Sequence, residues 1–176
     1  MLFLPVLQFS RIDGRIFLHD RESGKVYFSY PAHNVTDNPE GDPLQAGSGA
    51  PAPAGFLCIS PPDFISAQFQ MEFYRDRIEG PGPMPGESLV QGWGEFCQEE
   101  MGRVRFALGN PNAPAGSGDR AAWDRELLVH GGGWFHKPTR GCIRMADSDM
   151  EDLAAQVIRA RRSGLVISNI FVGGKS

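Results

Sequence analysis

The sequence predicts a mainly β fold with one long helix and several long loops rich in glycine and proline. Short apolar runs with strand-like alternation recur along the 176 residues, and turn-forming residues separate them. Glycine occurs 22 times and proline 14 times, above their usual shares of about 7% and 5%, so many turns should interrupt the strands. Only residues 148–162 have a clear helical period. A chain of this length fits one domain, taken as residues 1–176.

The first third of the chain has the pattern of an antiparallel meander. Residues 1–11 are apolar and predict a first strand, and residues 14–19 and 25–30 predict two more. Residues 20–24, Asp-Arg-Glu-Ser-Gly, have the composition of a hairpin turn. Residues 31–53 lack an apolar period and are rich in Pro, Gly, Asn and Asp, which predicts a long surface loop.

Short apolar or alternating runs predict four further strands, at residues 56–59, 102–108, 127–129 and 165–172. Residues 80–86 and 110–118 are broken by proline and glycine and predict loops. Residues 63–79 fit both periods, and we expect a helix at their start and a strand at their end.

The predicted helix at 148–162 has apolar residues on one face, at Met150, Leu153, Ala154, Val157 and Ile158. Ser148 and Glu151 have the spacing of a capping box, and Gly164 supplies a stop. This helix should therefore cover one side of the sheet structure.

Composition and charge restrict the function. A formal charge of -4 and a pI near 5.5 offer no broad basic surface, so no nucleic acid partner is expected. No run of about 18 apolar residues predicts a membrane span. The N-terminus lacks the positive region and the small-residue cleavage site of a signal peptide. A substrate outside the cytoplasm would therefore require another export route.

The residues that can carry chemistry lie between 129 and 145. Cys142 follows His130 by twelve positions, and an imidazole beside a thiol supplies the base that makes cysteine a nucleophile at neutral pH. Gly141 permits a tight turn, in which its own amide and that of Cys142 can face a developing oxyanion. If the chain is extended from Cys142 onward, Arg144 shares its face. There its guanidinium can lower the thiol pKa or bind a substrate carboxylate.

The remaining cysteines, the second histidine and the glycine run have simpler explanations. Cys58 and Cys97 lie in apolar surroundings without a nearby histidine and are expected to be structural. His136 and Cys142 fit no common zinc spacing, so no metal is expected. The glycine run at 131–133 is not followed by the Lys-Ser/Thr of a phosphate loop. Trp134 is expected at the rim of the site.

The segment Thr139-Arg-Gly-Cys-Ile-Arg-Met145 resembles the Ser/Thr-x-Gly-Cys-Ile-Arg signature of the L,D-transpeptidase (YkuD) catalytic domain, and residues 129–131 are similar to its His-Gly element. The resemblance implies a β-sandwich or barrel with a capping helix, and acyl transfer on peptidoglycan stem peptides without a cofactor. It makes Cys142 the nucleophile and His130 the base, oriented by a backbone carbonyl near Gly131. The expected substrate-binding residues are Arg144, Gly141, Thr139, Arg140, His136 and Trp134.

The sequence departs from the family pattern in two places. The interval from His130 to Cys142 is shorter than usual, which leaves His136 as a rival base, and Arg140 stands where many members have histidine. These features, with Trp93-Gly94, resemble a subgroup of short toxins delivered by type VI secretion. That subgroup implies action in the periplasm, a secretion apparatus and a cognate immunity protein.

Two alternative functions remain open. A cysteine endopeptidase or amidase of the NlpC/P60 kind would act on the same polymer, although there the cysteine precedes its histidine in the chain. A wall-binding module that kept the fold without catalysis would leave Cys142 with ordinary thiol reactivity.

Overall fold

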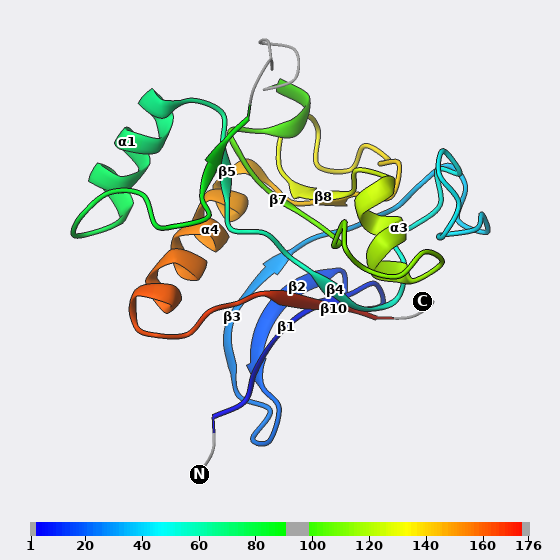
Figure 1. Ribbon diagram of the computed structural model, residues 1–176, viewed down its shortest axis with the longest axis horizontal. Helices are drawn as coiled ribbons and strands as arrows, with labels where there is room; N and C mark the ends of the chain where they lie inside the picture. Colours follow the sequence, from blue (N-terminus) through cyan, green and yellow to red (C-terminus); the bar gives the residue numbers. More distant parts are fainter. Residues whose placement is uncertain (1–2, 91–98, 174–176) are drawn as a thin grey trace.

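The computed structural model describes residues 3–90 and 99–173 and contains two five-stranded sheets with a small number of helices (Figure 1). The first sheet has the order β3-β2-β1-β10-β4. Its strands are β1 (Pro5–Ser10), β2 (Arg15–Asp20), β3 (Val26–Pro31), β4 (Gly55–Cys58) and β10 (Asn169–Val172). The predicted N-terminal meander is confirmed, and β10 pairs with β1 in parallel.

The second sheet has the order β6-β5-β7-β8-β9. Its strands are β5 (Asp63–Phe64), β6 (Ser88–Leu89), β7 (Val104–Ala107), β8 (Leu128–His130) and β9 (Ile143–Arg144). The pair β8 and β9 is parallel, and its register places His130 opposite Arg144. The two segments that the sequence marked for chemistry are therefore neighbours in one sheet.

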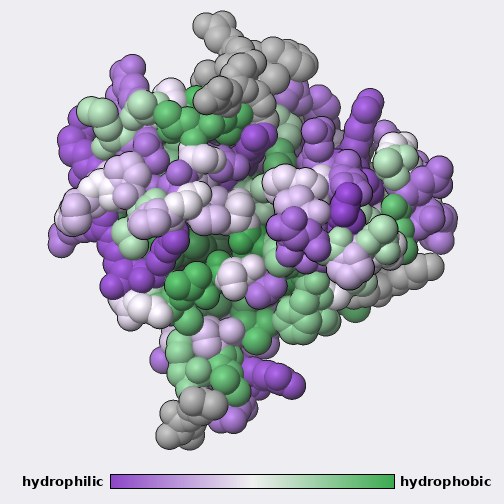
Figure 2. Space-filling view, in the orientation of Figure 1, coloured by the Kyte–Doolittle hydropathy of each residue, from purple (hydrophilic) through white to green (hydrophobic). Residues whose placement is uncertain are grey.

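A continuous hydrophobic core joins the sheets and the helices. Its largest fully buried side chains include Phe9, Phe64, Phe106, Met145, Leu153 and Ile170. Apolar side chains gather on the surface around β4 and β10 (Figure 2). On these two strands the rings of Phe56 and Phe171 lie 5.0 Å apart. The sheet-dominated architecture confirms the predicted mainly β class.

Helix α1 (Ala67–Arg77) corrects the expectation of a strand at the end of residues 63–79. The alternation of Phe69, Met71 and Phe73 suggested a strand, but Met71 is 71% exposed, whereas Phe69 and Phe73 are buried. These two phenylalanines are four residues apart, so they lie on one helix face, and both pack on Phe64. Burial of that aromatic face outweighed local strand propensity.

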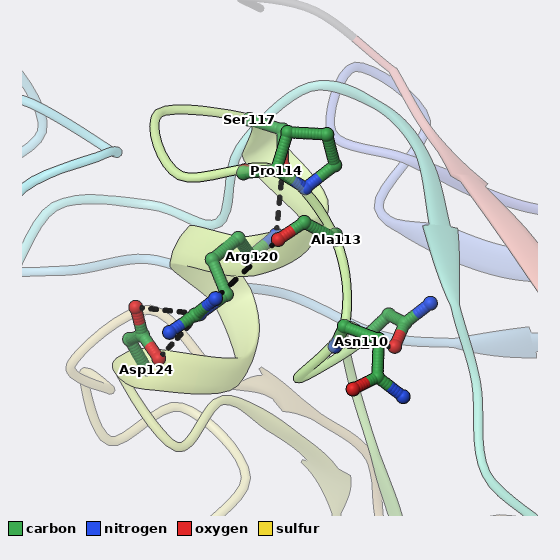
Figure 3. Close-up of polar contacts among 7 residues, drawn as sticks. Asn110, Ala113, Pro114, Ser117, Arg120 and Asp124 are labelled. Carbon is green, nitrogen blue, oxygen red and sulfur yellow. Dashed lines mark hydrogen bonds and ion pairs between the residues drawn. The ribbon is translucent and has the colours of Figure 1, made fainter.

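Helix α3 (Gly118–Asp124) was not predicted. Ser117 caps it by accepting a hydrogen bond from the Arg120 amide at 3.2 Å, and Arg120 pairs with Asp124 at 3.1 Å (Figure 3). Gly109 allows the helix to pack closely, because a Cβ there would lie 2.4 Å from the Asp119 carbonyl oxygen. With 7 residues it is too short to produce a recognisable period.

Helix α4 (Asp147–Arg162) confirms the predicted helix, but the predicted capping box is wrong. Its N-cap residue is Ala146, which makes no side-chain cap bond, and Glu151 pairs with Arg103 at 2.9 Å instead.

Among the described residues, no helix has the length and apolarity needed to cross a membrane.

Candidate functional site

A cavity of about 710 Å³ lies beside the ends of β8 and β9. Five of the residues predicted from the sequence line it, namely His130, Thr139, Arg140, Cys142 and Arg144. The long loop at 31–53 forms another part of its wall, through residues 37–38 and 47–49. Ile143 and Met145 are fully buried in the core, as alternation along an extended segment requires.

His130 is held by its own strand and by the following residue. The side chain is 2% exposed, and its Nδ1 lies 2.6 Å from the Gly131 carbonyl oxygen. A carbonyl can only accept, so Nδ1 carries the hydrogen and Nε2 has the free lone pair. Burial lowers the His130 pKa to about 4, and the nearby charges of Arg144 and Arg105 act in the same direction. The imidazole is therefore neutral at physiological pH and able to accept a proton.

Cys142 lies immediately before β9, the strand that pairs in parallel with the strand ending at His130. Its Sγ accepts a hydrogen bond from the Leu128 amide at 3.3 Å. Burial raises the pKa of the thiol, while that amide and the charges of Arg125, Arg144 and Arg105 lower it. The charge of Arg144 thus lowers the thiol pKa, as expected, but the effect of burial is larger and the thiol pKa is raised. The resting pair is a neutral thiol with a neutral imidazole.

Arg144 is buried and fixed by the backbone around it. Its Nη1 donates to the carbonyl oxygens of Gly132 and Glu100, and its main chain exchanges hydrogen bonds with His33 at 2.7 and 3.0 Å. Its buried Nε has no hydrogen-bond partner within the described part of the chain. The guanidinium therefore anchors the loop that follows His130, and binding of a substrate carboxylate stays a prediction.

Thr139 and Gly141 form the turn that precedes the cysteine. The Thr139 hydroxyl donates to the Cys142 carbonyl oxygen at 2.8 Å and accepts from the Gly141 amide at 3.1 Å. The Gly141 amide is thus engaged, so the Cys142 amide is the remaining candidate of the two expected oxyanion donors. Gly141 has φ +115, and a Cβ there would lie 2.6 Å from the Ala50 carbonyl oxygen.

The glycine run after His130 permits close backbone packing. The Gly132 amide donates to Asp147 Oδ1 at 2.7 Å, and a Cβ on Gly132 would lie 2.4 Å from the Gly102 nitrogen. A Cβ on Gly131 would lie 2.4 Å from Asp147 Oδ1. These glycines bring the start of α4 and residues 99–102 against the strand that carries the imidazole.

His136 and Trp134 are exposed and do not belong to the lining of the cavity. Trp134 is 69% exposed, and its ring lies 5.5 Å from that of His136. The structure therefore brings His130, and not His136, to the same cavity as Cys142.

Several cavity residues had not been singled out from the sequence. Arg125 lies at the end of α3, and Lys137 pairs with Glu100 at 2.8 Å. The position of Arg125, just before the strand that ends at His130, is the one feature that could have drawn attention to it.

Cys58, the other cysteine among the described residues, does not line this cavity. The Cys58 thiol donates to Asp119 Oδ2 at 3.2 Å, and burial with that carboxylate raises its pKa. Cys97 and the Trp93-Gly94 pair lie outside the described residues. Within residues 3–90 and 99–173, no three His, Cys, Asp or Glu side chains gather to hold a metal ion.

Comparison with known proteins gave distant structural likenesses. No protein-family model and no curated protein matches the chain. A crystal structure of Mycobacterium tuberculosis L,D-transpeptidase 1 is 13% identical, with a TM-score of 0.42 over 98% of this chain and 62% of that one. An L,D-transpeptidase from Xylanimonas cellulosilytica is 14% identical, with a TM-score of 0.44 over 98% of this chain and 61% of that one. The helical cell shape determining protein Pgp2 from Campylobacter jejuni is 16% identical, with a TM-score of 0.46 over 97% and 46%. The chain thus spans about half to three-fifths of the length of these neighbours.

Proposed function

We propose that this protein is a cysteine-dependent acyltransferase of peptidoglycan stem peptides, acting as an L,D-transpeptidase or L,D-carboxypeptidase. One observation carries the proposal: Cys142 and His130 line the same cavity, and the Gly131 carbonyl fixes the tautomer that leaves Nε2 as a base. The resemblance of residues 139–145 to the L,D-transpeptidase signature supplies the substrate class.

The proposed reaction moves one proton and one acyl group in each half. The Cys142 sulfur attacks the carbonyl carbon of the L,D amide bond after diaminopimelate, and its proton passes to His130 Nε2. The tetrahedral intermediate collapses as the C–N bond breaks, and the imidazolium returns the proton to the leaving D-alanine amine. An amine or a water molecule then attacks the thioester, which releases the product and restores the thiol.

The neutral resting pair favours proton transfer coupled to attack. Because burial raises the thiol pKa and lowers the imidazole pKa, an ion pair in the empty site is disfavoured. The negative charge then develops on the substrate oxygen, where the Cys142 amide can stabilise it. Arg140 is exposed, lines the cavity and supplies positive charge for the carboxylates of a stem peptide, whereas the charge of the neighbouring Lys137 is paired with Glu100.

Product analysis on a disaccharide tetrapeptide tests the proposal. We expect the wild type to give tripeptide, cross-linked dimer or exchanged D-amino acid, and Cys142→Ala to lose all three. His130→Ala should lower the rate about 10²- to 10⁴-fold, whereas His136→Ala should stay within about threefold because its ring lies outside the cavity lining. Cys58→Ser is the matched cysteine control.

Three results would contradict the proposal. If the wild type forms none of the three products, it lacks the proposed activity. Cleavage within the L-Ala-D-Glu-diaminopimelate segment would indicate an endopeptidase instead. A large loss in His136→Ala with an active His130→Ala would reassign the base. Action in the periplasm, delivery by type VI secretion and an immunity partner remain predictions of the sequence resemblance.

A further inference from the structure

Arg125 connects three parts of the chain that surround the nucleophile. Its Nη1 donates to the carbonyl oxygens of Pro43 at 2.7 Å and Pro51 at 3.2 Å. Its Nη2 donates to those of Ala50 at 2.5 Å and Arg140 at 3.1 Å. One guanidinium thus binds both the long loop that forms a cavity wall and the turn that leads into Cys142.

The long loop that Arg125 contacts also lines the cavity. Its residues 37–38 and 47–49 line the cavity, and the Asn38 side-chain amide donates to the Ser48 carbonyl oxygen at 2.8 Å. Figure 1 shows the loop, drawn in cyan, beside α3, from which Arg125 reaches it. The guanidinium therefore binds the same loop whose residues 37–38 and 47–49 line the cavity.

The turn before Cys142 packs directly on the same guanidinium. A Cβ at Gly141 would lie 2.7 Å from Arg125 Nη2 and 2.6 Å from the Ala50 carbonyl oxygen, so only glycine fits between the two. The Thr139 hydroxyl holds the other side of this turn. The position of the Cys142 backbone is thereby fixed from two directions.

The positive charge of Arg125 is not cancelled by its hydrogen-bond partners, because all four are neutral carbonyl oxygens. Of the charges acting on Cys142, that of Arg125 lowers the thiol pKa most, ahead of Arg144 and Arg105. Asp42 and Cys142 are the acidic groups whose charges act on Arg125 in turn.

We propose that Arg125 is a positioning residue for the chemistry of Cys142: it clamps the loop wall to the nucleophile turn and holds a fixed positive charge beside the reacting sulfur. The role rests on the proposed function for its substrate, but its effect on the thiol is measurable without any peptide. Failure of the tetrapeptide assay and failure of this inference are therefore separate outcomes.

Alkylation of Cys142 by iodoacetamide between about pH 6 and 10 tests the charge, with the modified peptide measured by mass spectrometry. Arg125→Met should lower the rate at pH 7 by about three- to tenfold and move the pH profile upward. Arg125→Lys keeps a cation and should stay closer to the wild type. Arg120→Met, which removes an arginine of the same helix that contacts Asp124 and Ala113, should match the wild type. Coincident profiles for Arg125→Met and Arg120→Met would overturn the charge role.

Hydrogen exchange of residues 42–51 and 139–142 tests the clamp. Lysine cannot reach four carbonyls arranged around a planar guanidinium, so Arg125→Lys should speed exchange in both segments by about threefold or more. Unchanged exchange would overturn the clamp. If Arg125→Met fails to fold, Arg125→Gln, which is neutral but keeps amide donors, replaces it. If neither neutral variant folds, the exchange measurement on Arg125→Lys decides alone.

Discussion

Thr139 acts on the nucleophile through the backbone of one tight turn. Replacement by valine keeps the shape of the side chain but removes the hydrogen bonds to the Cys142 carbonyl and the Gly141 amide. We expect Thr139→Val to lower the free energy of unfolding by about 1–3 kcal/mol and to reduce kcat. Thr139→Ser should recover most of both, as measured by denaturant unfolding and the tetrapeptide assay. A valine variant with wild-type kcat would argue against this positioning role.

Gly141 and Gly24 both have a positive φ, but only Gly141 is closely packed. Alanine there would need a φ of +115 and would also meet the Ala50 carbonyl oxygen and Arg125, whereas Gly24 has φ +72 with nothing within 4 Å. Gly24→Ala should therefore cost only the left-handed backbone, about 1–2 kcal/mol, and keep activity. Gly141→Ala should cost more than that and abolish activity, which thermal unfolding and product analysis can show. Equal losses of stability in the two variants would contradict the close packing.

At the residue scale, the sequence could predict the chemical groups but not all of their surroundings. His130 and Arg144 lie on two adjacent parallel strands and Cys142 directly precedes the second, so all three line one cavity. Their residue types in one short segment pointed there. Arg125 reaches Pro43 and Ala50 through backbone carbonyls, which carry no side-chain signal. Thr139 was expected to bind substrate, but its hydroxyl is engaged within the turn.

At the element scale, the start of α4 fixes the loop after the base. Asp147 accepts the Gly132 amide at 2.7 Å, while Asp149 lies in the same first helical turn. Both acids interact favourably with the helix dipole. Asp147→Ala should therefore cost about 1–2 kcal/mol of stability and lower kcat, whereas Asp149→Ala should cost about 0.5 kcal/mol and leave kcat unchanged. Similar kinetics for the two variants would show that the Gly132 contact does not position His130.

The helices also show where the local sequence pattern predicts secondary structure and where it fails. The period of α4 is sustained over four turns, so the sequence predicted it. Its start lies earlier than the capping-box spacing predicted: the helix begins at Asp147 with Ala146 as the N-cap residue, so Ser148 lies inside the first turn and cannot cap it. Helix α1 was mistaken in part for a strand, since its exposed Met71 fell between two buried phenylalanines.

At the scale of the whole molecule, the buried His130 makes stability depend on pH. Its pKa is lowered to about 4 in the fold, so the unfolded chain binds the proton more tightly between about pH 6.5 and 4. Stability from this group is present above about pH 6.5 and is lost as the pH falls towards 4, by roughly 3 kcal/mol in total. His33, whose pKa is also lowered by burial, acts in the same direction.

Denaturant unfolding from pH 7 to 4 can isolate this contribution. His130→Gln should flatten the acid-side slope relative to the wild type, because it removes the group that takes up the proton. His136→Gln replaces an exposed ring and should leave the slope unchanged. An unaltered slope in His130→Gln would mean that His130 is not held neutral by burial.

The most direct test of the central claim is intact-mass analysis of the protein quenched during turnover of a tetrapeptide stem. We predict a covalent adduct equal in mass to the stem minus D-alanine, located on the peptide that contains Cys142 and absent from Cys142→Ala. Release of D-alanine by Cys142→Ala, or an adduct on another residue, would contradict the account.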